Sequence, residues 1–216
     1  MTSAISACST GLPAEPPPRL RLAGLRSALA GPFDLTLAAG ECVAITGPSG
    51  AGKSLLLRMI ADLDPNEGEV WLDGQERRSW TAPAWRRQVV YNAAEAGWWA
   101  DRVAPHFPGA ALTATRALAP RLGLDPALLD AAVARLSTGE RQRLALLRAL
   151  AGDPSVLLLD EPTGALDEAS TGLVEALLAA RLATGTTILM VTHNPAQAAR
   201  MGKRHLRLAD RRLVAA

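Results

Sequence analysis

The sequence predicts an α/β fold with a mainly parallel sheet, an antiparallel β subdomain at its N-terminal side and a small helical insert. Short strands and turns fill residues 19–74, with a single helix among them. Later in the chain, continuous apolar runs alternate with helices, which is typical of a parallel sheet that helices cover on both faces. Between these two parts, residues 112–136 have a helical pattern without an intervening strand.

The expected elements follow in order along the chain. We expect strands at 19–25, 33–37, 41–46, 69–72, 88–91, 156–160 and 187–191. Helices are expected at about 53–62, 112–122 and 125–136, where Asp125 would cap the last helix and Pro126 would take its first position. A Ser-, Ala- and Pro-rich leader at 1–18 is predicted to be disordered. A single domain then covers 19–216, with the helical insert at about 95–150.

Composition excludes several classes of protein. The formal charge of +2 is too small to indicate a nucleic-acid partner. No uninterrupted apolar stretch reaches the roughly 18 residues that a membrane span requires. Cys8 and Cys42 provide neither a disulfide framework nor metal-ligand spacing, which favours a reducing cytosol. A basic cluster near the C-terminus is interpreted as a solvated edge of the protein: Lys203, Arg204, Arg207, Arg211 and Arg212.

The strongest local signal lies between the apolar run 42–45 and the helical run 55–57. It reads Gly47, Pro48, Ser49, Gly50, Ala51, Gly52, Lys53 and Ser54. This is the pattern G-x-x-x-x-G-K-[ST], in which backbone N–H groups surround phosphates, the lysine pairs with the β and γ oxygens and the serine faces Mg²⁺. The pattern predicts a P-loop NTPase core rather than an ordinary glycine turn.

A second candidate site is the acid pair Asp160 and Glu161, which ends the apolar strand at 156–160. In sheets that carry phosphoryl-transfer sites, such a strand lies beside the one that leads into the phosphate loop. Asp160 would then hold Mg²⁺ through water, and Glu161 would accept a proton from the attacking water. Alone, the pair would be read as solvated acids at a strand end. Together with the phosphate loop, it indicates a metal and catalytic site.

A third motif begins at Leu136 and continues as Ser137, Thr138, Gly139 and Glu140 before a run of apolar residues with helical spacing. By itself it is a helix N-cap with an acid at the third position. The helix end could also bind a second phosphate group. Since the chain already has one phosphate loop, this second anion site would serve a neighbouring subunit.

These motifs, with 158–163, 165–167 and Thr192-His193, occur in an order that resembles the nucleotide-binding subunits of ATP-binding cassette (ABC) transporters, over about 19–208. The resemblance implies ATP and Mg²⁺ as cofactors and ATP hydrolysis as the reaction. It also implies a separate transmembrane permease as partner. The subunit would be cytoplasmic, held at the inner face of the cell membrane through that permease.

The resemblance further implies a head-to-tail homodimer with two ATP molecules between its subunits. Each ATP would lie between the phosphate loop of one subunit and the 137–140 helix end of the other. Asp167 would occupy the loop that links the two sites. His193 would contact the γ-phosphate and orient the water together with Glu161; alone, a histidine after a strand would be read as structural.

The sequence departs from the family in three places. Ala94 stands where the family has a glutamine that senses Mg²⁺ and the attacking water, and Glu95 could substitute only if the loop shifts. An alanine methyl group cannot ligate a cation. The stretch 24–29 lacks the aromatic residue that usually stacks on adenine, a role that the planar guanidinium of Arg26 could take. Thr138 and Glu140 replace the usual glycine and glutamine, which a helix N-terminus should tolerate.

Trp98 and Trp99 follow the altered loop, and two interpretations stay open for them. They could cover the local core, or form an exposed aromatic knob that docks the permease. This region and the short insert look most like the stand-alone ATPase of bacterial metal (iron) exporters. Two alternatives to the transport ATPase are a soluble mechanical ATPase, which would usually carry a long coiled-coil insertion or two cassettes, and a nucleotide sensor with weak turnover.

Overall fold

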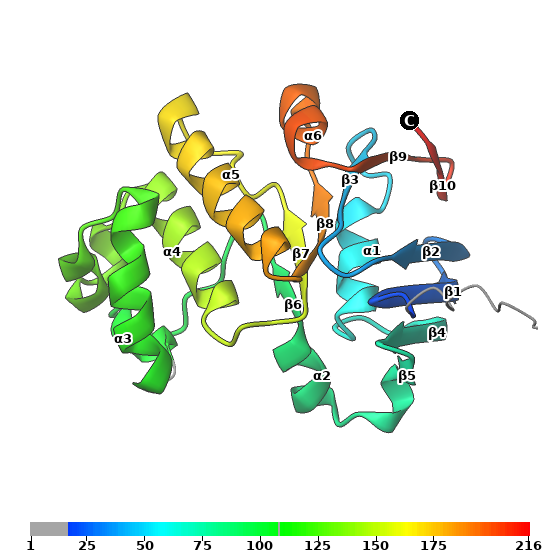
Figure 1. The fold of residues 1–216 in the computed structure, drawn as a ribbon, viewed down its shortest axis with the longest axis horizontal. Coiled ribbons are helices and arrows are strands. Elements are labelled where there is room, and N and C mark those ends of the chain that lie inside the picture. The colour runs from blue at the N-terminus through cyan, green and yellow to red at the C-terminus, as the bar shows by residue number, and fades with distance from the viewer. Residues whose placement is uncertain (1–16, 108) are drawn as a thin grey trace, which may run out of the picture.

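The computed structural model describes residues 17–107 and 109–216. The leader expected at 1–18 therefore lies outside the described residues, apart from Pro17 and Pro18. Figure 1 shows a central sheet with helices on both sides and a smaller antiparallel sheet at one end. The predicted α/β class, with a mainly parallel sheet and an N-terminal antiparallel part, is confirmed.

The main sheet has six strands in the order β10-β9-β3-β8-β7-β6. Five are parallel to one another: β6 (Val89–Asn92), β7 (Val156–Asp160), β8 (Thr187–Val191), β3 (Cys42–Thr46) and β9 (Arg204–Ala209). The sixth, β10 (Arg212–Ala215), pairs antiparallel with β9. This last hairpin was not expected, and its basic residues are exposed, as the interpretation of a solvated edge requires.

The smaller sheet has the order β2-β1-β4-β5 and is antiparallel throughout. It consists of β1 (Leu20–Arg26), β2 (Phe33–Leu37), β4 (Glu67–Leu72) and the short β5 (Gln75–Glu76). Alternation of buried and exposed residues along β2 shows that one face packs on the core and the other is exposed. This sheet lies beside α1 (Lys53–Ile60) and opposite the helical insert (Figure 1).

Five further α-helices are described. They are α2 (Ala82–Gln88), α3 (Gly109–Leu118), α4 (Thr138–Leu150), α5 (Glu168–Ala183) and α6 (Pro195–Met201). Short 3₁₀ helices lie at Arg77–Ser79, Ala104–His106, Ala119–Leu122, Pro126–Asp130 and Val133–Arg135. Helices α3 and α4 and the 3₁₀ segments from 104 to 135 form the helical insert at the left of Figure 1.

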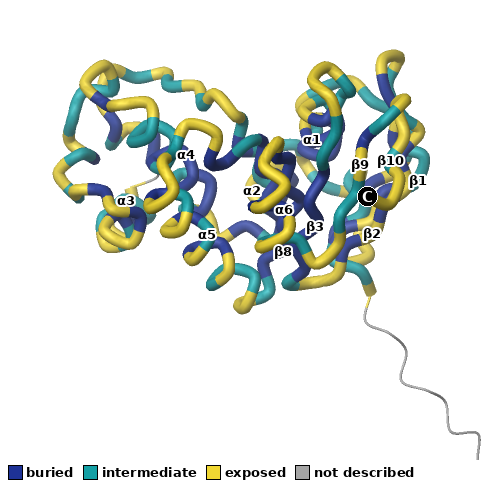
Figure 2. Tube along the Cα trace, turned by 90° about the horizontal axis from the view of Figure 1, so that it is seen from above, coloured by how far each residue is buried: buried dark blue, intermediate teal, exposed yellow. Residues whose placement is uncertain are grey.

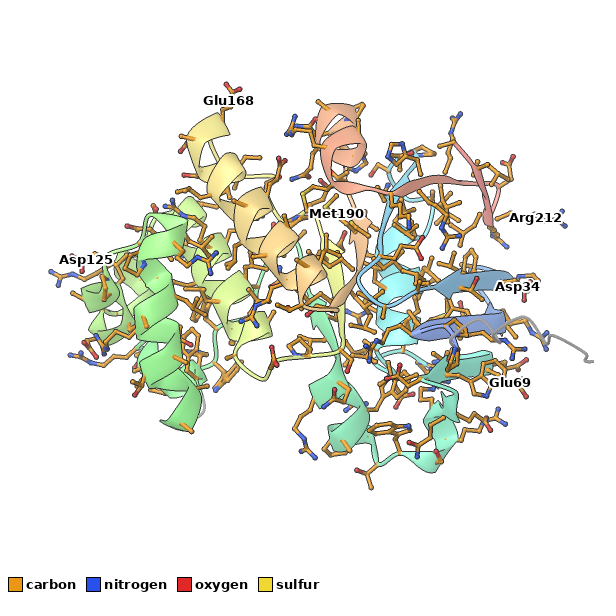
Figure 3. All side chains as sticks on the ribbon, viewed as in Figure 1. Asp34, Glu69, Asp125, Glu168, Met190 and Arg212 are labelled. Carbon is orange, nitrogen blue, oxygen red and sulfur yellow. The ribbon has the colours of Figure 1, made fainter. Side chains whose placement is uncertain are left out.

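Two hydrophobic clusters explain why the central strands are apolar without interruption. In β3, Val43 and Ile45 point into the cluster shared with α1 and the antiparallel sheet, whereas Cys42 and Ala44 point into the cluster shared with α4 and α5. The strands β7 and β8 alternate in the same way. Figure 2 shows the buried strands between exposed outer segments, and Figure 3 places Met190 of β8 centrally with labelled charged residues at the periphery.

The prediction of an α-helix at 125–136 is wrong, because this segment forms two short 3₁₀ helices. Asp125 does cap this segment, accepting a hydrogen bond from the Ala127 N–H at 2.8 Å, but the helix stops at Asp130 and a second 3₁₀ turn follows. The cause is tertiary pairing with the 101–103 segment. The Val103 N–H donates to the Ala131 carbonyl at 3.1 Å, and the Val133 N–H donates to the backbone carbonyl of Asp101 at 2.8 Å. Those backbone groups are then no longer available to a continuous helix.

Candidate functional site

The predicted phosphate loop, acid pair and His193 meet at one end of the main sheet, whereas the helix end at 137–140 and Asp167 belong to the starts of α4 and α5. In the register of the parallel strands, both Ile45 of β3 and Asp160 of β7 pair with Val191 of β8. The carboxyl ends of these strands therefore lie at the same edge, and the phosphate loop, the acid pair and His193 follow directly from them. This is the edge where open α/β sheets bind their ligands.

The phosphate loop has the backbone that an anion site needs. Gly47 and Gly52 lie in the left-handed region, with φ of 144° and 99°, and a Cβ at Gly47 would collide with the Leu208 carbonyl. Gly52 occupies the N-cap position of α1 and offers no side chain to cap it. The N–H groups of the first turn are therefore free to donate to an anion, and the helix dipole favours negative charge there.

Lys53 is buried, and its ammonium group donates to the carbonyls of Gly47 at 2.9 Å and Pro48 at 2.8 Å. The positive charge thus lies inside the loop, next to the place that phosphates would take. Ser54, in the first turn of α1, is exposed. Both residues stand where the sequence pattern puts a phosphate-binding lysine and a metal-binding hydroxyl.

Asp160 is buried at the end of β7, and its Oδ2 accepts a hydrogen bond from the Tyr91 hydroxyl at 3.0 Å. The hydroxyl of Ser54 and the carboxylate of Asp160 are oxygen donors of the kind that Mg²⁺ prefers, so these residues fit the cation. Within 17–107 and 109–216, no group of three or more His, Cys, Asp or Glu side chains could hold a metal alone. A cation here would take its remaining ligands from phosphate oxygens and water.

Glu161 and His193 lie together. The Glu161 Oε2 accepts a hydrogen bond from the His193 backbone N–H at 3.2 Å, and the imidazole Nε2 lies 3.4 Å from Oε1. Oε1 is buried and has no hydrogen-bond partner in the described part of the chain. Glu161 also has a φ of 48°, which is unusual for a residue with a side chain. An unpartnered carboxylate oxygen at this place suits a group that binds a water molecule.

Two glutamines whose role the sequence did not reveal hold the segment after Glu161. Gln142 of α4 donates to the Glu161 carbonyl at 2.7 Å and accepts from the Ala165 N–H at 3.1 Å. Gln197 of α6 is fully buried; it donates to Thr163 at 2.8 Å and accepts from Thr192 at 2.9 Å. Gln197 therefore links the loop after Glu161 to the residue before His193. A glutamine in a short helix carries no sequence signal for such a role.

The helix end at 137–140 has the predicted capping box. The Ser137 hydroxyl accepts from the Glu140 N–H at 3.2 Å, and the Glu140 carboxylate accepts from the Ser137 N–H at 2.8 Å. The hydrogen bonds from the Ser137 backbone and hydroxyl lower the pKa of Glu140. Ser137 and Thr138 are exposed, and Gly139 approaches Leu166. The role predicted for this helix end toward a neighbouring subunit stays a prediction.

Asp167 caps α5: its carboxylate accepts from the Ser170 N–H at 2.8 Å and from the Ser170 hydroxyl at 3.1 Å. These hydrogen bonds lower the pKa of Asp167. Its predicted role between two sites would add to this structural one.

Arg26, proposed to stack on adenine, instead donates to Glu67 at 2.7 Å, with both side chains largely exposed. Stacking therefore stays a prediction.

Each of the two interpretations, core packing and exposure, fits one of the two tryptophans. Trp98 packs against the hydrophobic cluster of the insert, whereas Trp99 is 71% exposed. The Arg148 guanidinium lies 4.9 Å from the centre of the Trp98 ring and 5.0 Å from that of Trp99. Beneath them, His106 Nε2 accepts hydrogen bonds from the Trp99 and Ala100 N–H groups at 2.9 and 3.1 Å. These contacts hold Trp99 in place although it is exposed.

The loop before Trp98 lies between two cavities. One, of about 330 Å³, is lined by residues of β6, Trp99 and Arg148. The other, of about 300 Å³, is lined by Ala94, Glu95 and the first turns of α4. Glu95 is exposed, as expected for a solvated acid.

A glycine-rich phosphate loop between β3 and α1, together with an acid pair at the end of β7, defines the class of P-loop nucleoside triphosphatases. The expectation that these two strands are neighbours is wrong, because β8 pairs with both and lies between them. The family model "ABC transporter" matches residues 31–164, and the chain belongs to this family. It is an ATP-binding ATPase of the ABC type. In the described residues, no helix is long and apolar enough to span a bilayer.

Several curated proteins are similar over most of this chain. Protein STAR1 of Oryza sativa subsp. japonica is 40% identical over 88% of this chain and 60% of its own length. The lipoprotein-releasing system ATP-binding protein LolD of Idiomarina loihiensis is 36% identical over 75% of this chain and 78% of its own. The thiamine import ATP-binding protein ThiQ of Escherichia coli K12 is 39% identical over 84% and 83%. The narrower resemblance to metal exporters stays a prediction.

Two solved structures share the fold. A dimeric, post-hydrolysis state of the ATP-binding cassette MJ0796 bound to ADP and Pi superposes with a TM-score of 0.77 and 27% identity, over 90% of this chain and 96% of the other. A bacterial Atm1-family ABC exporter with ATP bound gives a TM-score of 0.78 and 26% identity. That match covers 94% of this chain but only 40% of the exporter chain.

Proposed function

We propose that this chain is the subunit that binds and hydrolyses ATP to power a separate membrane permease. The observation that carries the proposal is the convergence of Lys53, Asp160, Glu161 and His193 at one sheet edge. Relatives named as ATP-binding proteins of import and lipoprotein-releasing systems support the link to transport. A soluble mechanical ATPase has no such support among these relatives, and the intact acid pair argues against a sensor with weak turnover.

Each side chain has a defined task in this proposal. The loop N–H groups and Lys53 bind the phosphates, and Ser54 and Asp160 would hold Mg²⁺. The cation neutralises charge on the phosphate oxygens when it is bound. Glu161 orients and deprotonates the attacking water through its unpartnered Oε1. His193, whose Nε2 lies 3.4 Å from that oxygen, would align the carboxylate and contact the γ-phosphate of a bound nucleotide.

We further propose that two copies close head to tail over two ATP molecules. The exposed helix end at Ser137 and Thr138, on α4, would supply the second phosphate-binding surface to the partner. ATP would favour the closed dimer because it contacts both subunits, and hydrolysis would remove that bridging contact. The solved cassette that is dimeric and bound to ADP and Pi supports the proposal of a dimer.

The dimer is tested with the Glu161→Gln variant. We expect it to bind ATP without turning it over and to elute as a dimer in ATP but as a monomer in ADP on size-exclusion chromatography. As a control, Thr138→Asp is combined with Glu161→Gln, and we expect this double variant to stay monomeric in ATP. An acid is favourable in the first turn of α4, so folding should be kept, while its charge repels a phosphate at the helix end. A Glu161→Gln chain that stays monomeric with ATP bound would contradict the proposed head-to-tail dimer.

The permease would dock at the cavity of about 330 Å³ beside Trp99. A short helix of the permease could insert there, because Trp99 presents a large exposed ring that Arg148 and His106 keep rigid. Rigid aromatic residues are the side chains most often found at interface hot spots. Ala94 cannot ligate the cation, so coupling between this groove and the nucleotide would have to use other residues.

Replacing Trp99 with Ala should weaken binding to the permease by about 2 kcal/mol, roughly 30-fold, and leave ATP binding by the isolated chain unchanged. The measurement is the affinity for the co-purifying membrane protein in nanodiscs. Trp71→Ala is the matched control, since Trp71 lies on β4 of the antiparallel sheet, where Arg21 covers its ring. Equal losses for both variants, or none for Trp99→Ala, would exclude this docking site.

A further inference from the structure

The one tyrosine of the chain connects β6 to the candidate metal carboxylate. Tyr91 lies opposite Leu158 in the parallel pair of β6 and β7, two residues before Asp160. Its half-buried hydroxyl reaches Asp160 Oδ2 at 3.0 Å. Residue 91 is also among those that line the cavity beside Trp99.

This hydrogen bond restricts a buried carboxylate. Asp160 is 5% exposed, and in a low-dielectric environment a hydrogen bond to a charged group is stronger than in water. The hydroxyl is the donor in this pair, since an ionised carboxylate can only accept. With Oδ2 held by the hydroxyl, Oδ1 is left for a cation or its water.

We propose that Tyr91 is a positioning residue for the cation: its hydroxyl fixes Asp160 so that the free carboxylate oxygen faces the Mg²⁺ of the bound nucleotide. The inference rests on the proposed function, which assigns Asp160 to the metal. It goes further in making β6 a contributor to the metal site through residue 91, three positions before Ala94, where the chain has no side chain able to reach a cation.

A purely structural role for Tyr91 is the competing explanation, because its ring also packs against the core. The two roles differ in what they do to the metal. A structural role changes thermal stability and every ligand alike. A positioning role changes the dependence on Mg²⁺ and leaves nucleotide binding without metal unchanged.

A spectroscopic test uses the unmutated protein. Since the chain has one tyrosine, labelling tyrosine with ¹³C at the hydroxyl-bearing ring carbon gives a single NMR signal. We expect this signal to shift when Mg²⁺ is added to protein that holds a non-hydrolysable ATP analogue, and not to shift in the Asp160→Asn variant. If the chemical shift of this signal does not change when Mg²⁺ is added to the unmutated protein, the proposal is overturned.

The Tyr91→Phe variant supplies the second test. We expect the Mg²⁺ concentration that half-saturates binding of a fluorescent ATP analogue to rise about 3- to 10-fold, within the range that one hydrogen bond is worth. Binding of the analogue in EDTA should stay the same. In the Asp160→Asn background, Tyr91→Phe should add nothing. An unchanged Mg²⁺ requirement in Tyr91→Phe overturns the inference, whereas an unchanged requirement in Asp160→Asn overturns the proposed metal role itself.

Discussion

Replacing Glu161 with Gln should lower ATP turnover by about 10²- to 10⁴-fold while nucleotide binding persists. The amide has almost the same shape as the carboxylate, and its oxygen can still accept from the His193 N–H. It cannot take a proton from water, since an amide is not a base at neutral pH. The measurement is steady-state phosphate release beside equilibrium binding of a fluorescent ATP analogue.

Glu76→Gln is the matched control for this loss. Glu76 lies on β5 of the antiparallel sheet, and its contact with Arg78 is at a long 3.7 Å. We expect its turnover to stay within twofold of the unmodified chain. If Glu161→Gln also kept its turnover within tenfold, another group would be the general base, and Glu161 would be reduced to aligning His193.

The meeting of the site residues could be predicted because it depends on sheet geometry. The phosphate loop, Glu161 and His193 each follow an apolar strand, and the carboxyl ends of parallel strands share one edge. Tyr91, Gln142 and Gln197 could not be predicted in the same way. The hydrogen bonds that join Tyr91 to Asp160, Gln142 to Glu161 and Gln197 to Thr163 span 69, 19 and 34 positions, so no local pattern marks them.

The errors in the expected fold have the same origin. The segment 125–136 has helix-forming residues and a good cap, but its backbone pairs with residues 101–103. Tertiary pairing overrode the local preference. The β9–β10 hairpin was missed because its arginines suggested a solvated edge, although Leu206 and Leu213 pack against the core. Trp98 and Trp99 are neighbours in sequence, and only the fold shows that one packs inside while the other stays exposed.

Lys53→Met should abolish most ATP binding without harming the fold. Lys53 is 6% exposed, and its ammonium donates to the carbonyls of Gly47 and Pro48; within 17–107 and 109–216 it forms no ion pair. A buried charge without a counter-ion is unfavourable, so the apo protein holds this charge at a cost to its own stability. Two hydrogen bonds from a charged group to phosphate correspond to about 10²-fold in affinity or more.

The expected result therefore has two parts with opposite signs. In a thermal melt without nucleotide, Lys53→Met should unfold at the same temperature as the unmodified chain or a higher one, because methionine fills similar space and the half-exposed loop carbonyls can bond to water. With saturating ATP and Mg²⁺, only the unmodified chain should gain stability, since ligand stabilisation follows affinity. A lower melting temperature of apo Lys53→Met would show that the loop needs the ammonium for its own structure. An undiminished gain with ATP would remove Lys53 from phosphate binding. If the apo variant melts no lower and ATP no longer stabilises it, the buried charge serves ligand binding and does not stabilise the fold. Functional sites depart in this way from the rules that stabilise the rest of a chain.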